Sequence, residues 1–160
     1  MEANQQRGIS LLEILLVVLV AAVIVSAAVI YYAQTLRGSR VAQAVNFLQQ
    51  VSKAGHEWLQ IPNSVGQYPA DFSGLSGLGD LVSLQLLPCE NSSCYKNSWG
   101  GTNTLTVDGN SQYMRVTLSL LPVADCSLLQ QQMQNIVTQG LSQQNYCQAA
   151  SGATTYQVYL

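Results

Sequence analysis

The pattern of apolar and polar positions separates a first stretch that is apolar on every side from a longer part with mixed patterning. Residues 9–33 read ISLLEILLVVLVAAVIVSAAVIYYA, and Glu13 is the only charged residue among them. A run of this length and composition predicts a helix that can cross a bilayer. Because an ionisable side chain at mid-membrane costs about 2.5–3.5 kcal/mol on insertion scales, we expect Glu13 to have a function that involves a cationic partner.

Helical periodicity continues beyond this run. Between residues 34 and 60, apolar or small residues recur at helical intervals, and no proline interrupts them before Pro62. We therefore expect one helix from about residue 10 to about residue 59, with a length of about 75 Å. Its rear half is amphipathic and is expected to pack on a globular head. The expected contact face consists of Val41, Ala44, Val45, Leu48, Val51, Gly55, Trp58 and Leu59.

Strand patterns dominate part of the second half. Residues 104–107 and 112–121 flank Asp108-Gly109-Asn110, which is typical of a β-hairpin. In the second of these strands, Val116, Leu118 and Leu120 alternate with polar residues and are expected on the buried face. Residues 154–160 alternate again and predict a closing strand.

Two further helices are expected in the same part. A short helix is predicted around residues 80–87, and Asp125 is expected to cap a second amphipathic helix. The apolar face of that second helix would carry Leu129, Met133, Ile136 and Val137. The expected fold is therefore α+β: a long N-terminal helix packed on an antiparallel sheet, with further short helices.

Charge and composition narrow the possible functions. The chain has 160 residues, a net charge of −2 and only 9% charged residues, and its six Lys and Arg do not cluster, so no nucleic-acid partner is expected. Residues 1–8 (MEANQQRG) have no apolar core of their own, and together with the following run they predict a short cytoplasmic leader before a signal anchor. Arg7 before the run and Arg37 and Arg40 after it fix the orientation only weakly.

All four cysteines follow the apolar run. An even number of cysteines in a small exported domain favours disulfides, and four cysteines allow three connectivities. Pairing of sequence neighbours, Cys89–Cys94 and Cys126–Cys147, is the preferred one. Four free thiols in a cytosolic domain are the alternative, whereas a zinc site is disfavoured because neither pair has CxxC spacing.

The sequence shows no catalytic constellation. His56 and the adjacent Glu57 project from different faces of a helix, so a dyad is not expected. No nucleophile elbow, phosphate loop or EF-hand spacing is present, and Trp58 and Trp99 are interpreted as core residues. We therefore expect no enzyme activity, no cofactor and no metal.

The N-terminal residues resemble a type IV pilin. The matching features are Arg7-Gly8, the junction of Gly8 with Ile9, Glu13 at the fifth position after that junction, and the long apolar helix. The resemblance implies the type IV pilin fold, cleavage by prepilin peptidase after Gly8, N-methylation of Ile9, and assembly through Glu13. It also implies an inner-membrane precursor with a cytoplasmic N-terminus that later becomes part of an extracellular pilus.

Later motifs are similar to the type IVb branch, which includes the toxin-coregulated and conjugative thin-pilus pilins. Tyr68-Pro69-Ala70 follows the long helix, residues 97–102 (NSWGGT) precede the sheet, and Cys126 and Cys147 match a disulfide of that branch. The short leader, the choice of Ile9 and the additional Cys89–Cys94 pair depart from the branch. Major and minor subunits therefore both remain open.

The resemblance implies three segments: a leader (1–8), the transmembrane and assembly half of the helix (9–33), and a periplasmic or extracellular head that includes the amphipathic half (34–160). The implied function is that of a filament subunit for adhesion, aggregation or mating contact. Its implied partners are other copies of itself, prepilin peptidase, the inner-membrane assembly machinery and, before assembly, the membrane. The alternatives are a pseudopilin or minor pilin of a type II secretion or pilus system and, from a different class, a membrane-anchored enzyme or sensor.

Overall fold

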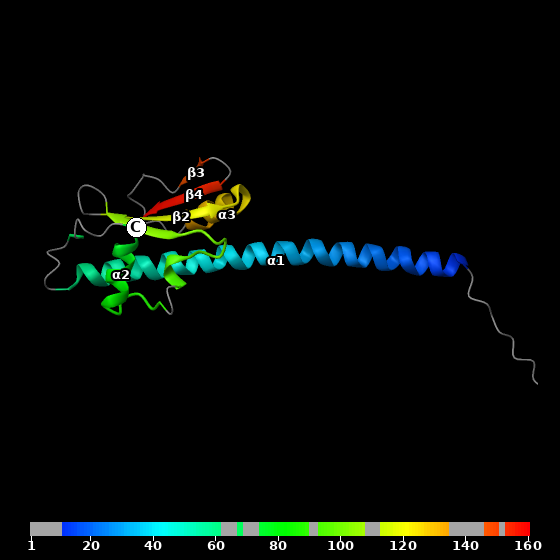
Figure 1. Ribbon diagram of the computed structural model, residues 1–160, viewed down its shortest axis with the longest axis horizontal. Coiled ribbons are helices and arrows are strands. Elements are labelled where there is room, and N and C mark those ends of the chain that lie inside the picture. The colour runs from blue at the N-terminus through cyan, green and yellow to red at the C-terminus, as the bar shows by residue number, and fades with distance from the viewer. Residues whose placement is uncertain are drawn as a thin grey trace, which may run out of the picture. The chain divides into compact units, whose positions relative to one another are not determined.

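The computed structural model describes residues 11–61, 67–68, 74–89, 93–107, 113–134, 146–150 and 153–160. The chain divides into two units, Met1–Gly38 and Ser39–Leu160. Helix α1, Leu11–Leu59, passes through both units, and its bounds agree with the expected helix. The other elements belong to the second unit, the head (Figure 1).

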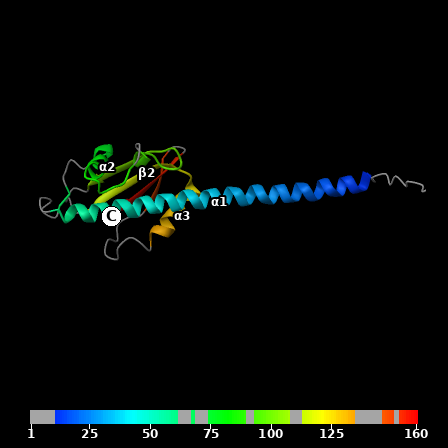
Figure 2. The ribbon, with the colours of Figure 1, turned by 90° about the horizontal axis from the view of Figure 1, so that it is seen from below.

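The rear half of α1 forms one wall of the head core. Figure 2 shows this half alongside the sheet, and its apolar face is buried as the periodicity predicted. The buried positions on α1 are Val41, Ala44, Leu48, Val51, Ala54 and Gly55, while Val45, Trp58 and Leu59 are half-buried against the same core. Burial of this stripe, rather than helix propensity, holds the rear half in place.

The sheet has four antiparallel strands in the order β1-β2-β4-β3. Strands β1 (Asn103–Val107) and β2 (Met114–Leu121) form the expected pair, and β4 (Ala153–Tyr159) is the expected closing strand. The sequence analysis did not predict β3 (Tyr146–Ala150), which pairs with β4 at the edge. Its sequence, YCQAA, has no clear alternation, so pairing with β4 determines its conformation.

A bulge interrupts β2 near its end. Leu118 pairs with Tyr156, but the next registered pair is Leu121 with Thr154, so β2 has one residue more than β4 in this interval. Leu120 has a left-handed backbone, with φ of 61°, and is 53% exposed. The expectation that Leu120 lies on the buried face is therefore wrong, whereas Val116 and Leu118 are fully buried.

The short helices differ in part from their expected positions. Helix α2 is Gly74–Ser83 rather than 80–87, and a turn follows it, in which the N–H groups of Leu86 and Leu87 both donate to the carbonyl of Leu81. A short 3-10 helix, η1, spans Ser93–Tyr95.

Helix α3 is Val123–Met133, with Leu129 and Met133 buried as expected. Its N-cap is Pro122, without a side-chain cap, so the expectation that Asp125 caps this helix is wrong. Asp125 lies in the first turn and is buried. Ile136 and Val137 lie outside the described residues.

The head core lies between the rear half of α1 and the sheet. Leu48, Leu105, Met114, Leu118 and Tyr156 are all fully buried within it. Burial also raises the pKa of the Tyr156 phenol, because the charged form would lose its hydration. The fold is thus α+β, with a long N-terminal apolar helix and a four-stranded antiparallel sheet.

Candidate functional site

The front part of α1 exposes an apolar surface on every side. Among the described residues, α1 is the one helix that is long and apolar enough to cross a membrane, and none of its most apolar window is buried. The exposed large side chains include Leu11, Leu12, Ile14, Leu15, Leu16, Val17, Val18, Leu19, Val20, Val23, Ile24, Val25, Val29 and Ile30. A surface of this size is far larger than the patches that monomeric soluble proteins expose, so it requires lipid or protein to cover it.

Two hydroxyl side chains within this part of α1 form hydrogen bonds to the backbone of the same helix. The hydroxyl of Ser26 donates to the carbonyl of Ala22 at 2.8 Å, and that of Thr35 donates to the carbonyl of Tyr31 at 3.0 Å. Such bonds to the preceding turn let hydroxyl side chains enter hydrocarbon without unpaired donors. Glu13, in the first described turn and exposed, is the charged exception in this stretch.

The apolar part ends in residues suited to a membrane interface. Residues 11–30 would span about 30 Å as a helix, which matches the thickness of a bilayer hydrocarbon core. Tyr31 and Tyr32 follow, both exposed, and Arg37 and Arg40 come within the next three turns. Tyrosine and arginine are favoured at the headgroup level. The composition of α1 thus fits a membrane anchor that begins close to Glu13.

The cleavage and modification residues predicted from the sequence cannot be placed next to Glu13. Gly8 and Ile9 lie outside the described residues, as do Pro69 and Ala70 of the second motif. Their functions therefore stay predictions. Tyr68 is described and is buried in the head core.

A network of hydrogen bonds, which we term the clasp, joins residues 97–102 to Ser119 of β2. The side-chain oxygen of Asn97 accepts from the N–H groups of Trp99 at 3.1 Å and Gly101 at 2.9 Å, and its side-chain nitrogen donates to the carbonyl of Ser119 at 2.7 Å. The Ser119 hydroxyl accepts from the N–H of Thr102 at 2.8 Å. One asparagine therefore closes its own loop and anchors it to the bulged strand.

The backbone geometry explains why both glycines within residues 97–102 are required. Gly100 has φ of 84°, in the left-handed region where glycine has no steric penalty. A Cβ on Gly101 would overlap the backbone carbonyl of Ser119. Residues 97–102 thus make a tight backbone contact with β2 beside the bulge.

The clasp is also joined to α3. The indole Nε1 of Trp99 donates to Oδ2 of Asp125 at 2.8 Å, and Asp125 is 2% exposed. Its other carboxylate oxygen, Oδ1, has no hydrogen-bond partner among the described residues. A buried carboxylate is costly unless it is bonded, so Trp99 offsets part of that cost. Sequence reasoning missed this pair because 26 positions separate its members.

The structure pairs the four cysteines as Cys89–Cys94 and Cys126–Cys147, the connectivity that the sequence favoured over free thiols and zinc. The Cα atoms are 5.6 Å apart in the first pair and 6.1 Å apart in the second. The second bond ties α3 to β3. Asn103 donates from Nδ2 to the carbonyl of Cys94 at 2.9 Å, which connects the first bond to β1.

Replacing both Cys126 and Cys147 with serine is expected to lower the stability of the head by about 3 kcal/mol, because the bond closes a loop with a sequence separation of 21. The matched control replaces Cys89 and Cys94, whose separation is 5 and whose expected effect is about 2 kcal/mol. Thermal melting of the full chain in detergent, with and without reductant, measures both effects. Identical melting of the oxidised and reduced wild-type protein would contradict this prediction.

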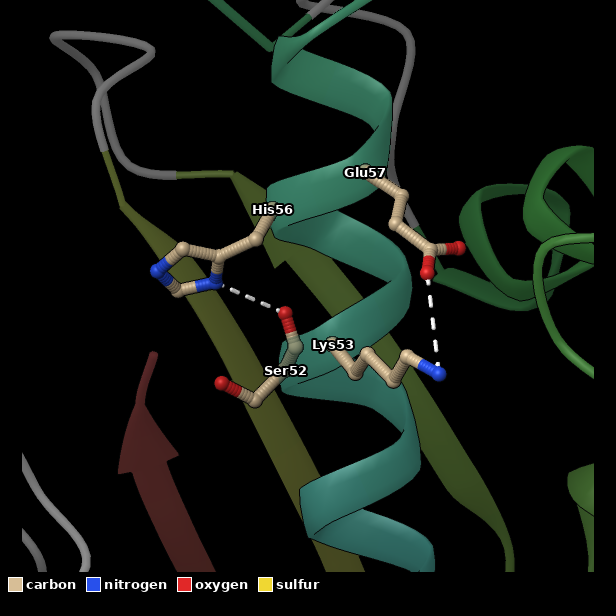
Figure 3. Close-up of polar contacts among 4 residues, drawn as sticks. All are labelled: Ser52, Lys53, His56 and Glu57. Atoms are coloured by element: carbon tan, nitrogen blue, oxygen red, sulfur yellow. Dashed lines mark hydrogen bonds and ion pairs between the residues drawn. The ribbon is translucent and has the colours of Figure 1, made fainter.

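The single histidine has a local partner on α1. His56 donates from Nδ1 to the carbonyl of Ser52 at 2.8 Å, and Lys53 forms an exposed ion pair with Glu57 at 3.7 Å (Figure 3). His56 and Glu57 point to different sides of the helix (Figure 3). This arrangement brings no acid to the imidazole, and a surface ion pair of this kind contributes little to stability.

One small cavity of about 170 Å³ lies between the rear half of α1 and the clasp. Its lining residues are Gln43, Ala44, Phe47, Lys96, Asn97, Ser98, Asn103 and Leu118. The hydroxyl of Ser98 donates to the side-chain oxygen of Gln43 at 2.6 Å. Within the described part of the chain, no three His, Cys, Asp or Glu side chains gather in a way that could hold a metal ion.

The described residues therefore show two separate features: an exposed apolar helix with one acid near its start, and an α+β head stabilised by disulfides and the clasp. Trp58 and Trp99, interpreted from the sequence as core residues, are both half-buried against the head core. Comparisons of the chain with protein-family models, with curated proteins and with solved structures found no match.

Proposed function

We propose that this chain is the structural subunit of a type IVb-like pilus, made as a membrane-anchored precursor and polymerised through α1. The observation that carries the proposal is the front of α1, whose apolar side chains are all exposed around a single acid. Such a helix is stable in two surroundings, a bilayer and a bundle of its own copies. A pilus subunit moves from the bilayer into such a bundle, so its helix has to be stable in each of these surroundings.

Glu13 supplies the selectivity in this proposal. Cleavage after Gly8 by prepilin peptidase creates an amine at Ile9, and N-methylation keeps its positive charge. Two opposite charges about 4 Å apart attract by about 4 kcal/mol at an effective dielectric of 20. Because an unpaired acid in lipid is costly, contact between Glu13 and the Ile9 amine of a neighbouring copy also removes an existing penalty. The pair would set the axial stagger of neighbouring helices.

The proposed location follows from the same argument. The precursor lies in the inner membrane with its N-terminus in the cytoplasm, and the assembly machinery transfers it into an extracellular filament. The two disulfides support a head exposed to an oxidising compartment. Adhesion, aggregation and mating contact are functions that such a filament serves.

Electron microscopy of fibres sheared from the cell surface, with mass spectrometry of their subunit, tests the proposal. We expect fibres made of this chain, lacking residues 1–8 and carrying one methyl group on the new N-terminus. Fibres whose subunits retain the leader, or cells without any fibre containing this chain, would reject it.

A pseudopilin or minor pilin is the second candidate, since both would use Gly8, Ile9 and Glu13 in the same way. The paired cysteines favour the pilin over the pseudopilin. The same mass measurement separates a major from a minor subunit, because a major subunit accounts for most of the protein in the fibre and a minor one for a small fraction.

A further inference from the structure

A second apolar surface lies on the head, at the junction of β2 and α3. It consists of Leu120, Pro122, Val123, Ala124 and Leu128, and we term it the apolar cap. Leu120 is 53% exposed, Val123 67% and Leu128 43%, and Pro122 and Ala124 are exposed as well. Leu128 follows Ala124 by one helical turn and lies on the same face of α3, and Leu120 and Pro122 directly precede the helix.

The backbone itself turns Leu120 outward. Strand alternation would continue the buried series of Val116 and Leu118, but the bulge and the left-handed φ of 61° direct Leu120 to solvent. A leucine rarely adopts this conformation, and backbone strain of this kind is concentrated at functional sites. The clasp holds the adjacent Ser119 through its carbonyl and its hydroxyl, and so fixes the bulge.

The chain that forms the apolar cap and follows it is nearly uncharged, although Lys96 is exposed beside Asn97 and Ser98 of the clasp. After Arg115, the chain contains a single charged residue, Asp125. Asp125 is buried and accepts a hydrogen bond from Trp99. The residues of α3, β3 and β4 therefore present no charged side chain that faces outward.

Charge favours one kind of partner for this surface. Two copies that meet through an uncharged surface neither repel each other nor have to desolvate an ion. An anionic membrane surface or a strongly charged protein would instead offer charges that have no counterpart on the outward faces of α3, β3 and β4.

We propose that the apolar cap is a contact surface between copies of this chain, with the bulge and the clasp presenting Leu120 to the neighbouring copy. The inference rests on the proposed function and adds a contact on the head to the contacts through α1. Filament formation then depends on two separate surfaces, and changes in the apolar cap should reduce assembly without affecting the membrane anchor.

The first test substitutes the apolar cap in the full-length chain, in its native cell. Leu120→Asn combined with Val123→Ser removes apolar area, and asparagine tolerates the left-handed backbone. We expect at least a tenfold loss of surface filaments, with an unchanged melting temperature and an unchanged amount of membrane-bound protein. Leu84→Ser is the matched control, because Leu84 is 46% exposed but lies outside the apolar cap. Normal filament numbers in the double variant would overturn the proposal.

The second test uses a photoreactive phenylalanine analogue at position 123 or, as a control, at position 84. We expect a crosslinked dimer of this chain from position 123 and none from position 84. Filaments without a dimer from position 123, or crosslinks from that position only to another protein, would overturn the inference and leave the pilus proposal standing. A dimer from position 123 in cells that make no filaments would support the contact and reject the pilus.

Discussion

Replacing Glu13 with alanine is expected to abolish filaments while the protein stays in the membrane. The exposed apolar side chains of α1 remain in this variant and continue to favour lipid. What is lost is the partner of the Ile9 amine, an attraction of about 4 kcal/mol at 4 Å and a dielectric of 20. A factor of ten in affinity corresponds to about 1.4 kcal/mol, so such a loss would lower subunit association by two to three orders of magnitude.

Two variants separate charge from shape in this experiment. Glu13→Gln keeps the size of the side chain and removes its charge, and it should fail in the same way as alanine. Ser26→Ala changes a polar side chain that bonds only within its own helix, and it should assemble normally. Filament counts by electron microscopy, set against the amount of protein in the membrane fraction, measure both. Abundant normal filaments from Glu13→Ala would refute the assigned function of the acid.

Replacing Gly101 with alanine is expected to destabilise the head by about 3 kcal/mol. The added Cβ would overlap the carbonyl of Ser119, which is backbone and cannot rotate away as a flexible side chain can. Relief would require β2 to move from the clasp, with loss of the bonds from Asn97 and Thr102 to Ser119. The melting temperature should fall by on the order of 10 °C.

The matched control is the same substitution at Gly38. A Cβ there meets no atom within 4 Å, and alanine favours a helix interior by about 1 kcal/mol over glycine. Gly38→Ala should therefore melt at or slightly above the temperature of the wild-type head. Thermal melting of the full chain in detergent, followed by the near-UV signal of the tryptophans, compares the two variants. Equal melting temperatures for Gly101→Ala and the wild type would contradict the prediction, because they would show that the clasp accommodates the added Cβ without loss of stability.

Where residues in contact are close in sequence, the sequence predicted the structure well. Helix α1 has uninterrupted helical periodicity from the apolar run to Pro62, and its buried face in the head follows the predicted intervals. The pairing of β1 with β2 follows from two strand-like segments on either side of Asp108-Gly109-Asn110, with alternation in the second of them. The neighbouring-cysteine pairing was preferred, although spacing alone allowed three connectivities.

Features that depend on distant contacts could not be predicted in the same way. Leu120 was assigned to the buried face because alternation carries no information about a bulge fixed by the clasp. Asp125 is a typical N-cap residue, which is why the sequence predicts a cap; its actual partner, Trp99, is 26 positions away and leaves no local signal. Strand β3 depends on pairing with β4 and has no clear pattern of its own. The glycine-rich sequence of α2 gives only a weak helix signal, so the predicted helix begins and ends later in the chain than the observed one.

The bond between Cys126 and Cys147 has a consequence for the order of maturation. Cys126 is fully buried in the head core, whereas Cys147 on β3 is half-buried. An oxidant that meets a folded but reduced head can therefore reach only the sulfur of Cys147, and Cys126 then has to resolve the mixed disulfide from inside the core. Oxidation before the core closes avoids this restriction, so the bond forms most readily while the head is still folding.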